Sequence, residues 1–214
     1  MMQIAGLYAI TPDLEDTEKL CRMVEASILG GARVVQYRNK VADASQRLTQ
    51  ASALLAICRK QQIPFIVNDH LDLFSALDAE GLHIGGDDGD IHATKQQIGK
   101  NKILGVSCYT NFSNAEKAEK LGADYVAFGA CFPSKTKPNA PRAELSLFTQ
   151  AQVLNIPAVA IGGITLENAC SVIKAGASAI AVIGELFNPI NALETEALEV
   201  KNRAKQFSSL FLSQ

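Results

Sequence analysis

The sequence predicts an α/β fold, a single (β/α)8 TIM barrel that spans residues 1–214. Short, β-prone apolar runs alternate with longer segments of helical periodicity, and eight such pairs follow one another along the chain. No linker or shift in composition divides the 214 residues, a length near the lower limit for this fold. The phrases Leu121-Gly122-Ala123-Asp124 and Ala175-Gly176-Ala177-Ser178 repeat one helix-to-strand connection. An open doubly wound sheet is the alternative, but no glycine-rich turn of the dinucleotide-binding kind follows the first strand.

The first four units are predicted from apolar runs and from helical faces that end at glycine or at polar residues. Leu20, Val24 and Ile28 give the first helix its apolar face, and Gly30-Gly31 end it. The predicted strands of these units are residues 4–10, 33–37, 64–67 and 81–84, and the predicted helices are residues 17–29, 45–61, 70–77 and 91–98.

The last four units follow the same pattern. Tyr125, Val126 and Phe128 form a short apolar run typical of a buried strand, and Ser113 with Glu116 predict a capping box. The predicted strands are residues 102–106, 124–128, 157–161 and 179–183, and the predicted helices are residues 113–121, 144–153, 165–175 and 191–207.

The composition limits the classes of partner. A hydrophobic fraction of 48% supplies a core, and a net charge of −2 argues against nucleic acid or an anionic membrane as the main partner. The N-terminus lacks the pattern of a signal peptide, and no apolar run reaches the roughly 18 residues that span a bilayer. Five scattered cysteines without a Cys-x-x-Cys pair indicate reduced thiols. We therefore expect a cytoplasmic protein.

Polar side chains and glycines gather where the predicted strands end. In a barrel of this kind the active site is built from the loops that follow the strands. Along the chain these residues are Gln36, Arg38 and Lys40, then Asn68 and Asp69, then Asp87 and Asp88, then Ser107, then Ser134, Thr136 and Lys137, then Gly162 and Gly163, and finally Gly184.

Two of these carboxylates predict a magnesium site. Asp69 and Asp88 end adjacent strands, so they can share one hard cation that also binds substrate phosphates. With Arg38, Lys40 and Lys137 facing the Mg²⁺ ion, the arrangement describes a diphosphate site. The alternatives are that the two cations after the second strand are ordinary surface charges, that the first carboxylate belongs to a helix cap, and that the second belongs to a turn.

A second phosphate site is predicted where the seventh and eighth strands end. In the segment 131–137, two hydroxyls and two ammonium groups follow Pro133, which suits phosphate oxygens but also describes a solvated basic loop. Gly162-Gly163 and Gly184 stand where many barrels bind phosphate through backbone N–H groups. The alternative is that these glycines only relieve crowding.

The histidines and Cys131 do not form a recognisable catalytic or metal-binding pattern in the sequence. His70, His83 and His92 do not have the spacing of a metal or catalytic group, and His83 lies within a strand, where a structural role is expected. Cys131 has no apparent partner base and is interpreted as a small apolar residue.

Six blocks of the sequence together resemble the thiamine phosphate synthase family. Each block is weak alone, but they occur in the right order from the second strand to the eighth. The blocks are Gln36-Tyr37-Arg38-Asn39-Lys40, Val67-Asn68-Asp69, Gly105-Val106-Ser107 and residues 81–88, 128–141 and 159–164.

The resemblance implies a transferase of thiamine biosynthesis. In that reaction the ring nitrogen of a thiazole phosphate displaces the diphosphate of 4-amino-5-hydroxymethyl-2-methylpyrimidine, giving thiamine phosphate and pyrophosphate, with a pyrimidine cation as intermediate. It also implies a homodimer that acts on small phosphorylated substrates.

The resemblance assigns residues to each ligand. The pyrimidine diphosphate would be held by Gln36, Tyr37, Arg38, Asn39, Lys40, Asn68, Ser107 and Lys137, of which Arg38, Lys40 and Lys137 are catalytic. Mg²⁺ would be held by Asp69 and Asp88. The thiazole phosphate would be held by Ser134, Lys135, Thr136, Gly163, Ile183 and Gly184. One position departs from the family, because Gly184 stands where a serine is usual.

Two alternatives remain beside this assignment. A related thiazole tautomerase has a similar barrel, but it lacks the acid pair and has a histidine where this chain has Ala130. A non-catalytic barrel that senses thiamine precursors would bind both ligands without forming product.

Overall fold

The computed structural model describes residues 4–86, 90–133, 141–187 and 195–212. Its eight parallel strands close in sequence order, each paired with the next and β8 with β1, which confirms the predicted (β/α)8 barrel. The strands are β1 (Gly6–Ile10), β2 (Ala32–Tyr37), β3 (Phe65–Asn68), β4 (Gly81–Ile84), β5 (Ile103–Tyr109), β6 (Tyr125–Phe128), β7 (Ala158–Ile161) and β8 (Ala179–Val182).

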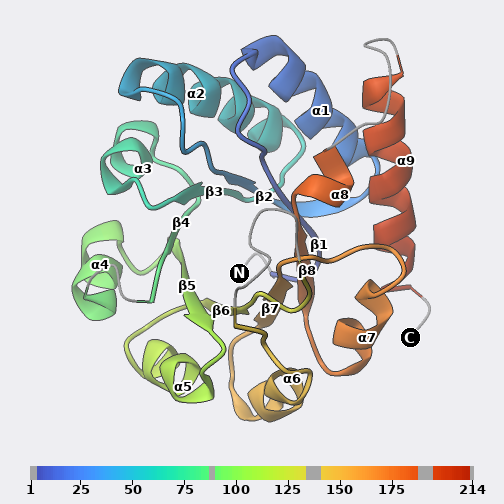
Figure 1. Cartoon of the computed structure of the whole chain (residues 1–214). Coiled ribbons are helices and arrows are strands. Elements are labelled where there is room, and N and C mark those ends of the chain that lie inside the picture. Colours follow the sequence, from blue (N-terminus) through green and yellow to red (C-terminus); the bar gives the residue numbers. More distant parts are fainter. Residues whose placement is uncertain (1–3, 87–89, 134–140, 188–194, 213–214) are drawn as a thin grey trace.

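The helices form a ring outside the barrel (Figure 1). Asp16, Asp43 and Asp90 begin three of them as N-caps that accept a backbone N–H. The α-helices are α1 (Thr17–Leu29), α2 (Ala44–Lys60), α3 (Leu71–Leu77), α4 (Ile91–Ile98), α5 (Phe112–Lys120), α6 (Ser146–Gln150), α7 (Ala169–Lys174), α8 (Gly184–Phe187) and α9 (Glu196–Ser209), and a 3-10 helix η1 spans Ala151–Val153.

Two apolar layers hold the barrel together. One lies between the strands and the helices, and the other fills the barrel interior with side chains such as Ile10, Val34, Ile66 and Val159. The alternation of side chains along each strand separates the two layers. On β2, Val35 and Tyr37 belong to the outer layer, so Gln36 between them lies in the interior.

The predicted strands and the first four helices agree with the structure to within a few residues, whereas three later helices differ. The predicted helix 144–153 is α6 followed by η1, and the predicted helix 165–175 is shortened to α7. The predicted helix 191–207 corresponds to α9, with residues 191–194 outside the described part, and α8 was not predicted.

The predicted capping box of α5 is wrong. Asn111 is the N-cap of this helix, and its side-chain oxygen accepts a hydrogen bond from the backbone N–H of Ser113 at 2.9 Å. Asn is as good an N-cap as Ser, so the composition 111–116 allowed either start.

Within the described residues, none of the helices combines the length and the apolar character that crossing a membrane requires.

Candidate active site

A cavity of about 250 Å³ lies where β2 and β3 end, at the C-terminal end of the barrel. It is lined by Arg38, Asn39, Lys40, Arg47, Asn68, Asp69 and His70. Five of these residues were predicted from the sequence as ligands of the diphosphate or the metal. The structure therefore places two predicted cations and one predicted metal ligand around a single opening.

The loop after β1 holds the loop that follows β2. Thr11 Oγ1 accepts the backbone N–H of Arg38 at 2.9 Å and donates to the carbonyl oxygen of the same residue at 2.9 Å. Asp13 Oδ1 accepts the backbone N–H of Lys40 at 2.8 Å and lies 3.4 Å from Arg38 Nη1. Sequence reasoning missed both residues, although their position directly after a strand was the signal that identified the others. They fix the backbone that presents the two cations.

Tyr37 and Asn39 support this loop from its outer side. Both side chains are buried, and both donate to Gln50 Oε1 on α2, at 2.9 Å from the Tyr37 hydroxyl and 3.0 Å from Asn39 Nδ2. Asn39 Oδ1 in turn accepts the backbone N–H groups of Val41 and Ala42. Burial raises the pKa of Tyr37 to about 12. Their predicted contacts with substrate stay predictions, and the contacts seen are those of a loop support.

Asp69 presents an exposed carboxylate from a left-handed backbone conformation. Its φ is 61°, its N–H donates to the carbonyl of His83 at 2.9 Å, and Asn68 Nδ2 donates to Asp69 Oδ2 at 2.6 Å. Asp tolerates this conformation better than most residues, and such strain concentrates at functional sites. The helix-cap alternative is wrong here, because His70 occupies the N-cap position of α3.

The other predicted metal ligand, Asp88, lies outside the described residues, as do Ser134, Lys135, Thr136 and Lys137. Their assignments stay predictions. Across the described ranges, His, Cys, Asp and Glu side chains do not gather in any group of three or more that could hold a metal ion.

Gln36 and Ser107 are not among the residues that line the cavity. Gln36 Nε2 donates to the hydroxyl of Tyr8 at 3.0 Å, and Ser107 Oγ lies 2.9 Å from His83 Nε2. Gln36 is buried inside the barrel, whereas Arg38 and Lys40 follow the end of β2 and line the cavity. Strand alternation would point these three side chains the same way, but β2 ends at Tyr37, before Arg38 and Lys40.

His83 and Cys131 are both buried. Burial lowers the pKa of His83 to about 4, so its imidazole is neutral at pH 7, and its two nitrogens make side-chain hydrogen bonds. Burial raises the pKa of the Cys131 thiol to about 12, as expected for a small apolar residue.

The glycines after β7 are required by the local backbone. Gly162 and Gly163 have φ values of 95° and 64°, and a Cβ at Gly163 would lie 2.5 Å from the carbonyl oxygen of Phe132. Asn168 Nδ2 holds the carbonyl of Gly163 at 2.9 Å. Crowding thus accounts for this pair, and its predicted contact with phosphate stays a prediction.

Gly184 differs from that pair. It is exposed at the start of α8, next to the half-buried Ile183, and a Cβ there would meet nothing within 4 Å. The space for a side chain is therefore present although the sequence does not use it.

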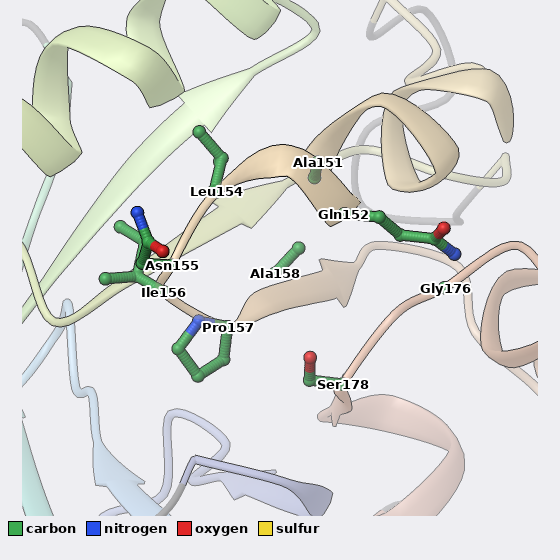
Figure 2. Close-up of a pocket in the computed structure, with 9 residues that line it drawn as sticks. All are labelled: Ala151, Gln152, Leu154, Asn155, Ile156, Pro157, Ala158, Gly176 and Ser178. Carbon is green, nitrogen blue, oxygen red and sulfur yellow. The ribbon is translucent and has the colours of Figure 1, made fainter.

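A second cavity, of about 310 Å³, lies at the opposite end of the barrel, where β7 begins (Figure 2). Its lining includes Gln152, Asn155, Pro157 and Ser178 but no ionisable side chain. It is the larger of the two cavities, yet it offers neither charge nor a metal ligand. The C-terminal cavity is the one equipped for phosphate chemistry.

A (β/α)8 barrel with cations and a carboxylate at its strand ends belongs to the class of barrel proteins that handle phosphorylated substrates. Residues 7–186 match the family model described as thiamine monophosphate synthase, and the chain belongs to this family.

Relatives of known name agree with the family match. A thiamine-phosphate synthase from Methylobacillus flagellatus is 54% identical over 208 residues, which cover 97% of this chain and 96% of that protein. One from Nitrosomonas eutropha is 47% identical over 98% of this chain and 96% of that protein. The predictions of family and of an enzyme of the transferase class are confirmed.

A solved structure shows the same fold. The thiamine phosphate pyrophosphorylase from Pyrococcus furiosus superposes with a TM-score of 0.83 and 29% sequence identity, over 98% of this chain and 96% of that one.

Proposed function

We propose that this protein joins a pyrimidine diphosphate to a thiazole phosphate, giving thiamine phosphate and pyrophosphate. The observation that carries the proposal is the cavity that brings Arg38, Lys40 and Asp69 together at the ends of β2 and β3. The relatives named thiamine-phosphate synthase, at 54% and 47% identity, support the same reaction. The thiazole tautomerase alternative gains no support at Ala130, which has no ionisable group.

The reaction needs charge stabilisation more than it needs a base. The bond between the pyrimidine methylene carbon and the diphosphate oxygen breaks, and its electron pair leaves with the diphosphate. The lone pair of the thiazole nitrogen then forms the new carbon–nitrogen bond, so no proton has to move. Arg38 and Lys40 stabilise the negative charge that develops on the leaving oxygen, and Lys137 is proposed to join them.

The residues present fit a magnesium ion. Asp69 supplies an exposed carboxylate oxygen at the cavity, and Mg²⁺ takes one or two carboxylates while keeping water and substrate phosphate as its other ligands. We assign Asp69 and Asp88 as its protein ligands. When bound there, the ion would neutralise part of the charge on the diphosphate.

The thiazole phosphate is assigned to the other side of the barrel mouth. Ser134, Lys135 and Thr136 would contact its oxygens together with Gly163 and the backbone of Ile183-Gly184. Backbone N–H groups at the ends of β7 and β8 bind phosphate in many barrels of this kind.

Pyrophosphate release by the purified protein tests the proposal. We expect release that requires both substrates and Mg²⁺, and none when either substrate is omitted or a chelator is added. Binding of both substrates without release of pyrophosphate would contradict the proposal and favour the sensing barrel.

A further inference from the structure

Five side chains from five strands form a continuous hydrogen-bonded chain across the barrel interior. Gln36 Nε2 lies 3.0 Å from the Tyr8 hydroxyl, which lies 2.7 Å from the Tyr125 hydroxyl. The Tyr125 hydroxyl lies 2.9 Å from His83 Nδ1, and His83 Nε2 lies 2.9 Å from Ser107 Oγ. We call Gln36, Tyr8, Tyr125, His83 and Ser107 the interior chain. Its two ends are residues assigned to the pyrimidine.

The packing of the barrel interior accommodates the interior chain. Tyr8 and Tyr125 are fully buried among apolar side chains, with their rings edge to face at 5.9 Å, and the His83 ring stacks on Tyr125 at 5.5 Å. On β5, a Cβ at Gly105 would lie 2.1 Å from the Tyr125 ring, so glycine makes the space for it. Two phenylalanines would fill the same apolar space and would bring no buried hydroxyl that needs a hydrogen-bond partner. The need to fill the barrel interior therefore does not by itself explain why both residues are tyrosines.

The hydrogen positions along the interior chain follow from its first donor. Gln36 Nε2 can only donate, so the Tyr8 oxygen accepts. Among the described residues the other partner of the Tyr8 hydroxyl is the Tyr125 oxygen, so we assign the Tyr8 hydrogen to that oxygen. The Tyr125 hydrogen in turn points to His83 Nδ1, which must be unprotonated. A neutral imidazole with a free Nδ1 has its proton on Nε2, and this proton is donated to Ser107 Oγ.

We propose that the interior chain fixes Ser107 as a hydrogen-bond donor toward the substrate. Because Ser107 Oγ accepts from His83, its own hydrogen is left for an acceptor such as a ring nitrogen of the pyrimidine. Tyr8, Tyr125 and His83 are thus positioning residues that act through Ser107. This role rests on the proposed function, whereas the direction of the interior chain does not.

The direction can be measured on the resting protein. The chain has three histidines, so nitrogen-15 spectra of histidine-labelled protein give one set of ring signals for each, and His83→Gln identifies the set in question. We expect a proton on Nε2 and none on Nδ1. A proton on Nδ1 would reverse the interior chain, make Ser107 an acceptor and overturn the proposal.

Two variants test the link to Tyr125. In Tyr125→Phe the group that points to Nδ1 is lost, so the Nε2–H form should no longer be fixed. In Tyr37→Phe a buried hydroxyl is also lost, but from the outer layer at Gln50, and the His83 signals should not change. An unchanged tautomer in Tyr125→Phe, or an equal change in both variants, would overturn the proposal.

Substrate binding tests whether the interior chain acts through Ser107. Calorimetric titration of Tyr125→Phe should show about tenfold weaker binding of the pyrimidine diphosphate, the effect of one hydrogen bond, with thiazole phosphate binding unchanged. Unchanged pyrimidine binding alongside a changed tautomer would remove the role of Ser107. The wild-type protein could also bind both substrates and show the expected Nε2–H tautomer yet release no pyrophosphate. That result would contradict the proposed reaction but not the direction of the interior chain.

Discussion

The cavity at the barrel mouth and the interior chain beneath it use opposite kinds of polar group. The cavity presents ionised side chains that reach the solvent: Arg38 and Lys40 on a loop anchored by Asp13, and Asp69 directly after β3. The interior chain consists of neutral, buried groups linked in one direction through Tyr125 and His83. Charge is effective on a diphosphate whose negative charge grows during reaction, whereas directional hydrogen bonds distinguish the edges of an uncharged ring.

The largest effect is expected at the cavity. Arg38→Ala should lower turnover by about 10²–10³-fold, because it removes a cation that is proposed to stabilise the leaving oxygen. Steady-state kinetics with thiazole phosphate at saturation measure it. Arg22→Ala on α1 is the matched control, because this exposed arginine is not among the residues that line the cavity. A turnover within a factor of two of the wild type would remove Arg38 from the mechanism.

Asp69 gives a sharper test of the metal. Asp69→Asn keeps a residue that tolerates the left-handed φ of 61° while removing the carboxylate charge. We expect an unchanged thermal midpoint and a loss of turnover that higher Mg²⁺ partly restores. Full activity at the wild-type Mg²⁺ requirement would refute the assignment of this ligand.

The burial of His83 in the barrel interior makes the stability of the protein depend on pH. The pKa of its imidazole is about 4 in the folded protein against 6.5 ordinarily, because burial disfavours the charged form. The unfolded chain therefore binds the proton more tightly, and stability is lost as the pH falls from 6.5 toward 4. The loss should reach about 3 kcal/mol at the lower end. Denaturant unfolding at several pH values should show it in the wild type and not in His83→Gln; equal slopes would contradict the account.

The packing of the interior can be broken at Gly105. Its Cβ would overlap the Tyr125 ring, so Gly105→Ala should lower the free energy of unfolding by about 1–3 kcal/mol. At Gly184 a Cβ meets nothing, and Gly184→Ala should change stability by less than about 1 kcal/mol. Thermal unfolding of the two variants compares them, and equal losses would contradict the packing argument.

The smallest effect is expected from Gly184→Ser. The open space admits the hydroxyl without displacing a neighbour, so one added hydrogen bond should strengthen thiazole phosphate binding by roughly two- to tenfold. Calorimetric titration of the variant measures it. Unchanged binding would show that the thiazole phosphate does not reach this position.

The sequence predicted most of the fold because its signals were local. Alternating strands and helices and repeated helix-to-strand connections required only short windows of residues. The α8 helix was missed because its four residues are too few for helical periodicity, and the cap at Asn111 because a neighbouring serine offered the same chemistry.

The sequence predicted the charged residues of the candidate site but not the buried residues that hold them or that form the middle of the interior chain. Arg38, Lys40 and Asp69 stand directly after strands, which is a position that sequence can mark. Gln50 acts from the middle of α2, and Tyr8 and Tyr125 meet across the barrel from positions 117 residues apart. Pairing at such a distance along the chain depends on strand order and register, which no local pattern contains.

The most direct test of this division of labour compares Arg38→Ala and Tyr125→Phe in the same kinetic assay. The account predicts that the first variant lowers kcat by about 10²–10³-fold with a smaller change in the KM for the pyrimidine diphosphate. It predicts that the second raises that KM about tenfold with a smaller change in kcat. The reverse pattern, or the same pattern in both variants, would contradict it.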